Sequence, residues 1–325
     1  MLTVTIIIPL HRRTRAFERC VEAAVAVSHG RHEVLVVADK DPGVLPESVR
    51  LVLTNSPTDT SPAEKRDIAL AEASGEVCAF LDDDAFPRDD WLESALLLFE
   101  LDADGRVAGV GGPGVTPPGS GWRERAGGAF YESPFGSGGV RFRFRPEGSV
   151  RDVDDLPAFN LFMRTDALRA IGGWASKLYG GEDTMVCLRL VEAGYRLLYD
   201  PEVVVYHHRR PVFGPHLRQV GNVGRHRGHF ARVLPQTSRR PLYFAPTAGL
   251  LIGALGLVAI TTNRRLRLPG AAAAVSGWAV IATQARKDGC EPTIAAALPA
   301  VVVASHASYG VQFLRGFFTR SIEEM

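Results

Sequence analysis

Residues 77–84, Val-Cys-Ala-Phe-Leu-Asp-Asp-Asp, decide the fold class and locate the predicted site. The apolar run at residues 77–81 is typical of a strand that is buried on both faces. Asp82, Asp83 and Asp84 follow it directly, and in open α/β sheets ligands bind at the carboxyl ends of strands. Adjacent negative charges repel unless a cation neutralises them, and carboxylates suit Mg²⁺ or Mn²⁺ bound together with substrate phosphates. The stretch therefore predicts a divalent metal site, and the alternative is a solvated acidic turn that caps the helix after Pro87.

The sequence around this stretch alternates strands and helices. The alternation predicts an α/β fold with a mostly parallel sheet covered by helices. The second helix opens with Ser61, Pro62 and Glu64, which together form a capping box. Up to residue 111, strands are predicted at 3–9, 33–38, 50–54, 77–81 and 107–111, and helices at 16–27, 61–73 and 90–101.

Residues 111–150 are rich in Gly and Pro and show no clear period. They predict long loops with short strands over the site. Further along the chain, strands are predicted at 159–163 and 203–206, and helices at 165–171 and 182–193.

Two further groups of polar residues carry weaker signals. Glu182 and Asp183 follow two glycines at a predicted helix start, where they would either cap the helix or supply a general base on a rigid element. His207 and His208 end an apolar run, and strand side chains alternate faces, so only one ring can point into a given site. That ring would complete a metal shell, and the alternative is a pair of surface histidines.

The last third of the chain has the composition of a membrane domain. Residues 241–263, 268–285 and 292–314 are uncharged, and a hydrocarbon core of about 30 Å needs roughly 20 helical residues. The second segment is Ala-rich and could instead be a buried or tilted helix, and a wholly soluble helical domain is the alternative for all three. We therefore predict two to three transmembrane helices.

Charge distribution bears on how these segments are oriented. Eight Arg and no Asp or Glu occur in residues 207–240, which fits an anionic lipid surface or a diphosphate ligand, or else a solvated loop. With the N-terminal domain in the cytoplasm, three crossings would place Arg264, Arg265 and Arg267 outside, against the positive-inside tendency. Either the tendency fails in this chain or one segment does not cross.

Net charge, cysteine content and the N-terminal segment give further information on the class of protein. The net charge of +1 indicates no particular partner. The four cysteines are scattered without a C-x-x-C pair, so they predict neither a zinc site nor a disulfide framework and suit a reducing compartment. The N-terminal apolar run is short and no basic residue precedes it, which favours a first strand over a signal peptide.

Taken in order and spacing, these segments resemble the family 2 glycosyltransferases of the GT-A fold over roughly residues 3–210. The matching pieces are Ile6-Ile7-Ile8-Pro9, Glu33-Val34-Leu35-Val36-Val37, Lys65-Arg66-Asp67, Phe80-Leu81-Asp82-Asp83-Asp84, Asp90-Trp91-Leu92, Ala158-Phe159-Asn160-Leu161-Phe162, Ile171-Gly172-Gly173-Trp174 and Gly181-Glu182-Asp183 through Ala193-Gly194-Tyr195. The C-terminal part is more loosely similar to bacterial membrane-bound members from exopolysaccharide and cell-envelope gene sets, through His207-His208-Arg209-Arg210-Pro211, His226-Arg227-Gly228 and His306-Ala307-Ser308-Tyr309-Gly310.

The resemblance implies a role for each matched residue. Asp84 would bind the metal, together with His207, which we slightly prefer to His208. Asp183 would be the catalytic base that deprotonates the acceptor hydroxyl. The remaining residues fall into a donor-binding set, Pro9, Asp39, Arg66, Asp82 and Asp83, and an acceptor-side set, Glu182, Asn160 and Trp174.

The sequence also departs from the family pattern. Many members carry two acids and Gly-Ser after the second strand, where this chain has Ala38-Asp39-Lys40-Asp41, so the identity of the nucleotide stays open. Asp67 stands where Asn is usual. The Q-x-x-R-W motif of processive synthases is absent, because the corresponding region reads Gln219-Val220-Gly221-Asn222, and this favours the addition of one sugar over polymerisation.

The resemblance thus implies inverting, metal-dependent transfer of a single sugar from a nucleoside diphosphate sugar to a lipid-linked or saccharide acceptor in cell-envelope or exopolysaccharide synthesis. We expect a catalytic GT-A domain at residues 1–235 and a membrane domain at 236–325. Membrane lipids are expected partners and nucleic acid is not. The expected location is the cell membrane, with the catalytic domain on the cytoplasmic side.

Three alternatives remain open from the sequence. An enzyme that glycosylates polyprenyl phosphate would depend less on Asp183, because a phosphate is already a good nucleophile. A non-catalytic membrane binding module of the same fold would not need the matched carboxylates. A nucleotidyltransferase would usually need a Gly-rich basic loop after the first strand, where residues 11–15 are basic but contain no Gly.

Overall fold

The computed structural model describes residues 2–28, 31–56, 58–176 and 181–319. The chain forms two compact units, one from residues 1–117 and 142–208 and the other from residues 118–141 and 209–325. Each unit thus combines two separate stretches of the sequence.

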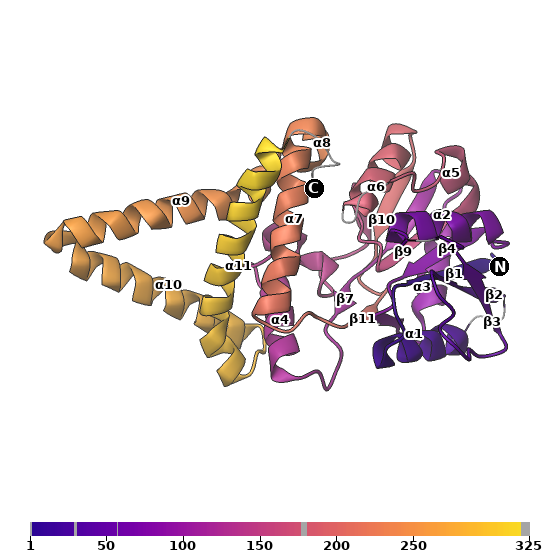
Figure 1. Cartoon of the computed structure of the whole chain (residues 1–325), viewed down its shortest axis with the longest axis horizontal. Helices are drawn as coiled ribbons and strands as arrows, with labels where there is room; N and C mark the ends of the chain where they lie inside the picture. Colours follow the sequence, from indigo (N-terminus) through magenta and orange to yellow (C-terminus); the bar gives the residue numbers. More distant parts are fainter. Residues whose placement is uncertain (1, 29–30, 57, 177–180, 320–325) are drawn as a thin grey trace. The chain divides into compact units, whose positions relative to one another are not determined.

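An eight-stranded sheet forms the centre of the first unit, in the order β3-β2-β1-β4-β9-β6-β10-β8 (Figure 1). The pairings give six strands one common direction, with β9 antiparallel to β4 and β6, and β8 antiparallel to β10. This arrangement confirms the predicted mostly parallel sheet. The strands are β1 (Val4–Leu10), β2 (His32–Ala38), β3 (Val49–Leu53), β4 (Val77–Leu81), β6 (Val107–Gly111), β8 (Arg151–Val153), β9 (Asn160–Arg164) and β10 (Arg196–Tyr199).

Helices cover both faces of this sheet, which is why β1 and β4 are apolar at nearly every position. Ile6 and Ile8 of β1 pack into the same cluster as Phe17 of α1 (Arg15–Ala26), whereas Ile7 packs into the opposite cluster with Leu70 of α2 (Pro62–Glu72). Adjacent residues of one strand thus reach different helical layers. The other helices of the unit are α3 (Trp91–Glu100), α5 (Thr165–Ala170) and α6 (Glu182–Glu192).

The predicted capping box is present at the start of α2. The Ser61 hydroxyl accepts a hydrogen bond from the Glu64 backbone N–H at 3.2 Å, and the Glu64 carboxylate accepts one from the Ser61 N–H at 3.0 Å. These bonds fix the first turn of the helix that carries Lys65, Arg66 and Asp67.

A second, three-stranded sheet lies beyond the end of β4. It contains β5 (Ala85–Pro87), β11 (Val205–His207) and β7 (Gly114–Val115), with β11 in the middle. β11 runs antiparallel to β5 with His207 opposite Ala85. This register brings a residue from late in the chain beside the acidic turn.

The second unit is helical. Its core contains apolar residues of α4, α7, α9, α10 and α11, with Phe130, Val220 and Leu298 among the buried side chains. Three of its helices are long and apolar enough to cross a membrane, by length and composition. Its elements are α4 (Trp122–Glu132), α7 (Gly214–Val233), α8 (Pro235–Ser238), α9 (Pro241–Thr262), η2 (Arg264–Leu266), α10 (Arg267–Lys287) and α11 (Pro292–Phe318), and η1 (Gly138–Arg143) straddles the two units.

Several features differ from the sequence-based expectation. The segment predicted as long loops contains α4, and the basic stretch after His207 is the helix α7. The strands β5, β8 and β10 were not predicted, and the last strand begins two residues later than expected. Local signals fail for α4 and α7 because both contain internal glycines with low helix propensity, and packing against α11 stabilises them. The second compact unit includes the chain from residue 209 onward, whereas the predicted membrane domain begins at residue 236.

Candidate active site

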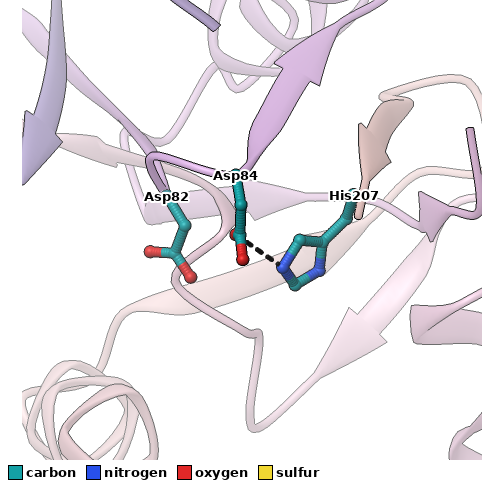
Figure 2. A group of neighbouring side chains, drawn as sticks. All are labelled: Asp82, Asp84 and His207. Carbon is teal, nitrogen blue, oxygen red and sulfur yellow. Dashed lines mark hydrogen bonds and ion pairs between the residues drawn. The ribbon is translucent and has the colours of Figure 1, made fainter. Parts of the chain in front are cut away.

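The acidic turn after β4 is positioned by the two sheets. Asp82 follows the last residue of β4, and Asp84 precedes the first residue of β5. Because β11 pairs with β5, the Nε2 atom of His207 lies 3.0 Å from the Oδ1 atom of Asp84 (Figure 2). The backbone N–H of His208 donates to the Asp84 carbonyl at 3.0 Å, and the Phe159 ring packs 4.6 Å from the His207 ring, so the imidazole is held from both sides.

Asp82, Asp84 and His207 form a group that fits a divalent cation. One ligand atom from each residue lies within 4.8 Å of the others, and Figure 2 shows the imidazole of His207 reaching from β11 toward the turn that carries both carboxylates. Burial raises the pKa of Asp82, although Arg66 opposes the shift, while the neighbouring Asp84 adds to it. A cation at this position would relieve the repulsion, and the two carboxylates suit Mn²⁺ or Mg²⁺. The structure places His207, and not His208, in this group.

Arg66 connects the acidic turn to α6. Its guanidinium is 2% exposed and donates to Asp82 at 2.8 Å and to Glu182 at 3.2 Å. It also lies 4.6 Å from the centre of the buried Trp174 ring. Glu182 and Trp174, which we predicted on the acceptor side, are thus buried partners of Arg66 and fix its orientation.

Asp67, the departure from the family pattern, anchors the loop that contains Trp174. Its carboxylate accepts hydrogen bonds from the backbone N–H groups of Trp174 at 2.6 Å and Ala175 at 2.9 Å. Gly173 has a φ of +76°, and a Cβ at this position would lie 2.3 Å from the carboxylate. An aspartate thus satisfies two successive backbone donors here, and a glycine is required beside it.

Asp39 lies directly after β2 and is joined to the end of β1 through Lys65. The buried Lys65 ammonium is 2.7 Å from the Asp39 carboxylate and donates to the Leu10 carbonyl at 2.8 Å. Burial alone would raise the pKa of Asp39, but hydrogen bonds from Lys65, Thr60 and Thr54 outweigh it and lower the pKa to about 2. The predicted nucleotide-side residue is therefore a fixed, ionised carboxylate at the carboxyl edge of the sheet.

Asp39→Asn is expected to lower the free energy of unfolding at neutral pH, because loss of one partner of a buried pair costs about 3–5 kcal/mol. The folded pKa lies below the ordinary value of 3.8, so the stabilisation by the carboxylate is complete above that value and is lost as pH falls through about 2. The difference between wild type and variant should therefore shrink by about 2 kcal/mol over this range. Denaturant titrations in detergent at several pH values measure it, and a pH-independent difference would contradict the assignment.

The remaining donor-side residues also lie at the carboxyl ends of β1 and β4. Pro9 is buried within β1 opposite Val37. Asp83 accepts a hydrogen bond from the His11 backbone N–H at 3.1 Å, which ties the acidic turn to the loop after β1. These contacts bring every predicted donor-side residue to one edge of the sheet, as expected from parallel strands.

The side chain of Asn160 is held in the protein interior by hydrogen bonds. It is fully buried, and its amide group accepts from the Trp91 indole at 2.7 Å and donates to the Val203 carbonyl at 2.7 Å and the Pro113 carbonyl at 3.3 Å. These bonds hold the start of β9 to α3 and to the segments before β7 and β11. The acceptor-side role of Asn160 stays a prediction.

Asp183 occupies the second position of α6, directly after Glu182. It is half-buried, and its carboxylate accepts a hydrogen bond from the Thr184 backbone N–H at 2.8 Å. Gly181 precedes the helix with a φ of +82°, whereas Gly180, the other glycine of the motif, lies outside the described residues. Asp183 is not a member of the group formed by Asp82, Asp84 and His207.

Two residues that the sequence argument did not single out contribute to the site. Lys65 fixes Asp39, and Phe159 packs against His207. Lys65 and Phe159 lie in sequence motifs that match the family, next to Arg66 and Asn160. This position was the only feature of the sequence that could have identified them.

Comparison with known proteins agrees with this geometry. Residues 5–152 match the model of the family described as Glycosyl transferase family 2. A pre-mycofactocin glycosyltransferase of Mycobacterium tuberculosis is 30% identical over 214 residues, which are 64% of this chain and 43% of the relative, so the chain spans less than half of that protein. The glycosyltransferase AglE of Haloferax volcanii is 25% identical over 241 residues, which are 68% of this chain and 72% of the relative.

Two solved structures share the fold. The mannosyltransferase PcManGT from Pyrobaculum calidifontis, in complex with GDP-Man and Mn²⁺, superposes with a TM-score of 0.59 at 20% identity and covers 98% of this chain and 88% of that one. GalNAc-T7 with UDP, GalNAc and Mn²⁺ gives a TM-score of 0.50 at 16% identity and covers 74% of this chain and 52% of that one. At these identities the likeness concerns the fold alone.

Proposed function

The chain belongs to glycosyl transferase family 2 and has the GT-A fold, and from that premise we propose that it transfers one sugar from a nucleoside diphosphate donor to an acceptor with inversion at the anomeric carbon. The observation that carries the proposal is the group of Asp82, Asp84 and His207 at the carboxyl end of β4. Carboxylates bound to a cation at a strand end are the means by which a protein of this fold class holds a diphosphate. The Mn²⁺ in the complexes of the two structural neighbours supports the same reading.

In the proposed reaction, the acceptor oxygen attacks the anomeric carbon while the bond from that carbon to the diphosphate oxygen breaks. Asp84 and His207 would hold the cation, which supplies electrostatic stabilisation of the departing diphosphate. Arg66 orients Asp82 through its 2.8 Å contact and opposes the rise in the pKa of Asp82 that burial causes. Asp183 takes the acceptor proton, and the nucleoside diphosphate leaves with the electron pair of the broken bond.

A screen of nucleotide sugars for released nucleotide, with and without Mn²⁺, tests the proposal. We expect release from one donor class, dependent on the metal, and faster in the presence of the true acceptor. A protein that binds nucleotide sugars without turning over any of them would favour the alternative of a non-catalytic binding module.

His207→Ala is expected to weaken Mn²⁺ binding by about 10-fold or more, because it removes one of the ligands from the group. His208→Ala is the matched control. The centre of the His208 ring lies 6.0 Å from that of Phe86, and the backbone N–H of His208, which the substitution keeps, donates to the Asp84 carbonyl. Calorimetric titration of both variants with Mn²⁺ distinguishes them. A loss of affinity confined to His208→Ala would show that the other ring binds the metal.

The acceptor is proposed to be a lipid-linked saccharide. Three long apolar helices, all within residues 241–318, support a location where such an acceptor is presented, and the absence of the processive motif supports addition of a single sugar. We place the catalytic domain on the cytoplasmic side of the membrane, where nucleotide sugars are made, and the pathway in cell-envelope or exopolysaccharide synthesis.

The full chain is expected to resist extraction from membranes by high salt and by alkali, and to dissolve in detergent. Alkaline and detergent extraction followed by centrifugation and blotting measure this. Basic residues alone would give attachment that high salt reverses, so the salt wash separates surface binding from insertion. Recovery of the intact chain in the soluble fraction would remove the membrane part of the proposal.

A further inference from the structure

The three candidate membrane helices differ in what surrounds them. Of the most apolar 18-residue window, 6% is buried in α9 and none in α10, whereas half is buried in α11. The three helices meet the same criteria of length and composition, so the difference in burial comes from tertiary packing.

α9 and α10 form a hairpin (Figure 1). The side chains of both helices are exposed on all sides along most of the hairpin. Ile252 and Leu255 of α9 are 70% and 71% exposed, and Val275 of α10 is 69% exposed. Among the described residues, the hairpin packs on α11 at its base. The first turns of α9 contribute contacts such as Phe244 with Phe313, and the last turns of α10 contribute the buried Ala285. Helices of 22 and 21 residues are about 32 Å long, which matches a hydrocarbon core of about 30 Å. A lipid bilayer is the partner that such an all-round apolar surface fits.

α11, by contrast, is joined to α7 along its C-terminal half. At Gly224 and Gly228 of α7 an added Cβ would lie 2.5 Å and 2.0 Å from backbone oxygens of α11, and at Gly316 it would lie 1.8 Å from the Arg225 carbonyl. The two backbones are therefore in contact, and no layer of lipid separates them. A bilayer that enclosed this part of α11 would have to enclose α7 as well.

α7 has the wrong composition for that environment. It carries Arg218, Arg225, Arg227 and Arg232, and each charge at the centre of a bilayer is unfavourable. The His216 ring of α7 is also hydrogen-bonded to Ser305, at the middle of α11, at 2.9 Å.

The N-terminal half of α11 is held by α4 in the same polar manner. The Trp122 indole donates to Thr293 at 3.3 Å, and Arg125 pairs with Glu291. His306, near the middle of α11, is hydrogen-bonded to the Phe135 carbonyl at 2.6 Å. One face of α11 thus contacts other parts of the protein over its whole length. The opposite face exposes apolar residues such as Val303 and Val311.

We propose that, among the described helices, α9 and α10 alone cross the bilayer, and that α11 lies at the membrane surface with one face on α4 and α7 and the apolar face toward the lipid. The inference rests on the proposed membrane attachment and specifies its topology. Two crossings return the chain to its starting side, so the C-terminus and the catalytic unit lie on the same side. In-plane helices with one apolar face are a recognised mode of membrane association.

The charges at the helix ends fit two crossings. Arg239 and Arg240 precede α9, and Arg286 and Lys287 end α10, so these four residues lie on the catalytic side. Arg315 of α11 joins them there, whereas a third crossing would carry the C-terminal end of α11 to the far side. The positive-inside tendency therefore favours the cytoplasm for the catalytic side despite the three Arg near the hairpin tip.

Cysteine labelling with a membrane-impermeant maleimide in sealed vesicles of both orientations tests the topology of the full chain. Cys290 is replaced by Ser, and the buried Cys20, Cys78 and Cys187 are kept. One protein carries an added cysteine before Met1, the second carries Arg265→Cys at the tip, and the third carries an added cysteine after Met325. We expect the first and third to be labelled from one face and Arg265→Cys from the opposite face.

Two labelling outcomes would overturn the proposal. Labelling of the C-terminal cysteine from the same face as Arg265→Cys would show that α11 crosses. Labelling of all three from one face would show that the hairpin does not cross. Nucleotide release, measured on the same vesicles, reports separately on the glycosyltransferase proposal.

A matched pair of substitutions adds a second measurement. Leu255→Glu and Val303→Glu each place a charge at an exposed apolar position near the middle of its helix, 71% and 65% exposed. Leu255→Glu should reduce the fraction of chain retained after alkaline extraction, whereas Val303→Glu should leave that fraction and the labelling pattern unchanged. Equal losses in both variants would contradict an in-plane α11.

Discussion

Asp84→Asn is expected to abolish metal-dependent donor binding and to lower turnover by about 10³-fold or more while the protein stays folded. The substitution keeps the shape of the side chain and its ability to meet the His207 ring at 3.0 Å, but removes the charge that binds the cation. A metal that stabilises developing negative charge is worth several kcal/mol in the transition state, and each 1.36 kcal/mol is a factor of ten in rate. Calorimetry of donor binding with and without Mn²⁺ and a nucleotide-release assay measure the two effects.

Asp89→Asn is the matched control for this prediction. Asp89 lies two residues beyond β5 and is exposed, so its neutralisation changes the local charge by the same amount without touching the group at the acidic turn. We expect wild-type donor affinity and turnover. If the wild-type protein binds its donor equally well with and without the metal, the proposed role of Asp84 is wrong.

Asp183→Asn is expected to lower turnover by about 10²–10⁴-fold with little change in donor affinity, because it removes a general base and keeps the shape of the side chain. Asp183 lies in the first turn of α6, where the helix dipole and free backbone N–H groups favour a negative charge. That makes it an ionised but modest base, which is sufficient if the proton leaves late, after bond formation to the sugar has made the hydroxyl more acidic. Turnover with the true acceptor and donor affinity by calorimetry are the measurements.

Glu182→Gln is the control variant that separates the effect of Asp183 from that of the neighbouring carboxylate. Glu182 is buried against Arg66, so this variant should lose stability and disturb the orientation of Arg66, with a smaller loss of turnover than Asp183→Asn. Near-wild-type turnover of Asp183→Asn would exclude it as the base. That result would favour transfer to a polyprenyl phosphate, since a phosphate acceptor needs no strong base.

Sequence reasoning predicted those parts of the fold whose signals are local. The apolar strands β1 and β4 and the capping box at Ser61 depend on neighbouring residues, and the structure contains all of them. α7 was not predicted, because a helix with Gly214, Gly221, Gly224 and Gly228 lacks local propensity and is stabilised by a partner far along the chain. Tertiary packing is the information that the local pattern does not contain.

The same distinction holds within the candidate site. The acidic turn was predictable because three carboxylates at a strand end have few other uses. The surroundings of Glu182 and Asn160 were not, because a motif gives residue types in order but does not show that Arg66 or Trp91 already occupies their polar atoms. The choice of His207 over His208 depends on the register of β11 with β5, a non-local pairing that the sequence alone does not determine.

The helical unit consists of two separate stretches of the sequence, so its parts are synthesised at different times. α4 ends at Glu132, whereas its partner α11 begins only at Pro292, so the catalytic unit and both helices of the hairpin are synthesised before α11. Until α11 is synthesised, Phe130 and Val220 lack the α11 side chains that belong to the same core. Exposed apolar surfaces of this kind attract chaperones. The hairpin is synthesised before the last helix, so in the proposed topology its insertion can begin before the helical core closes. A translation product that stalls before residue 292 would present both unpaired helices to the quality-control proteases of the cell.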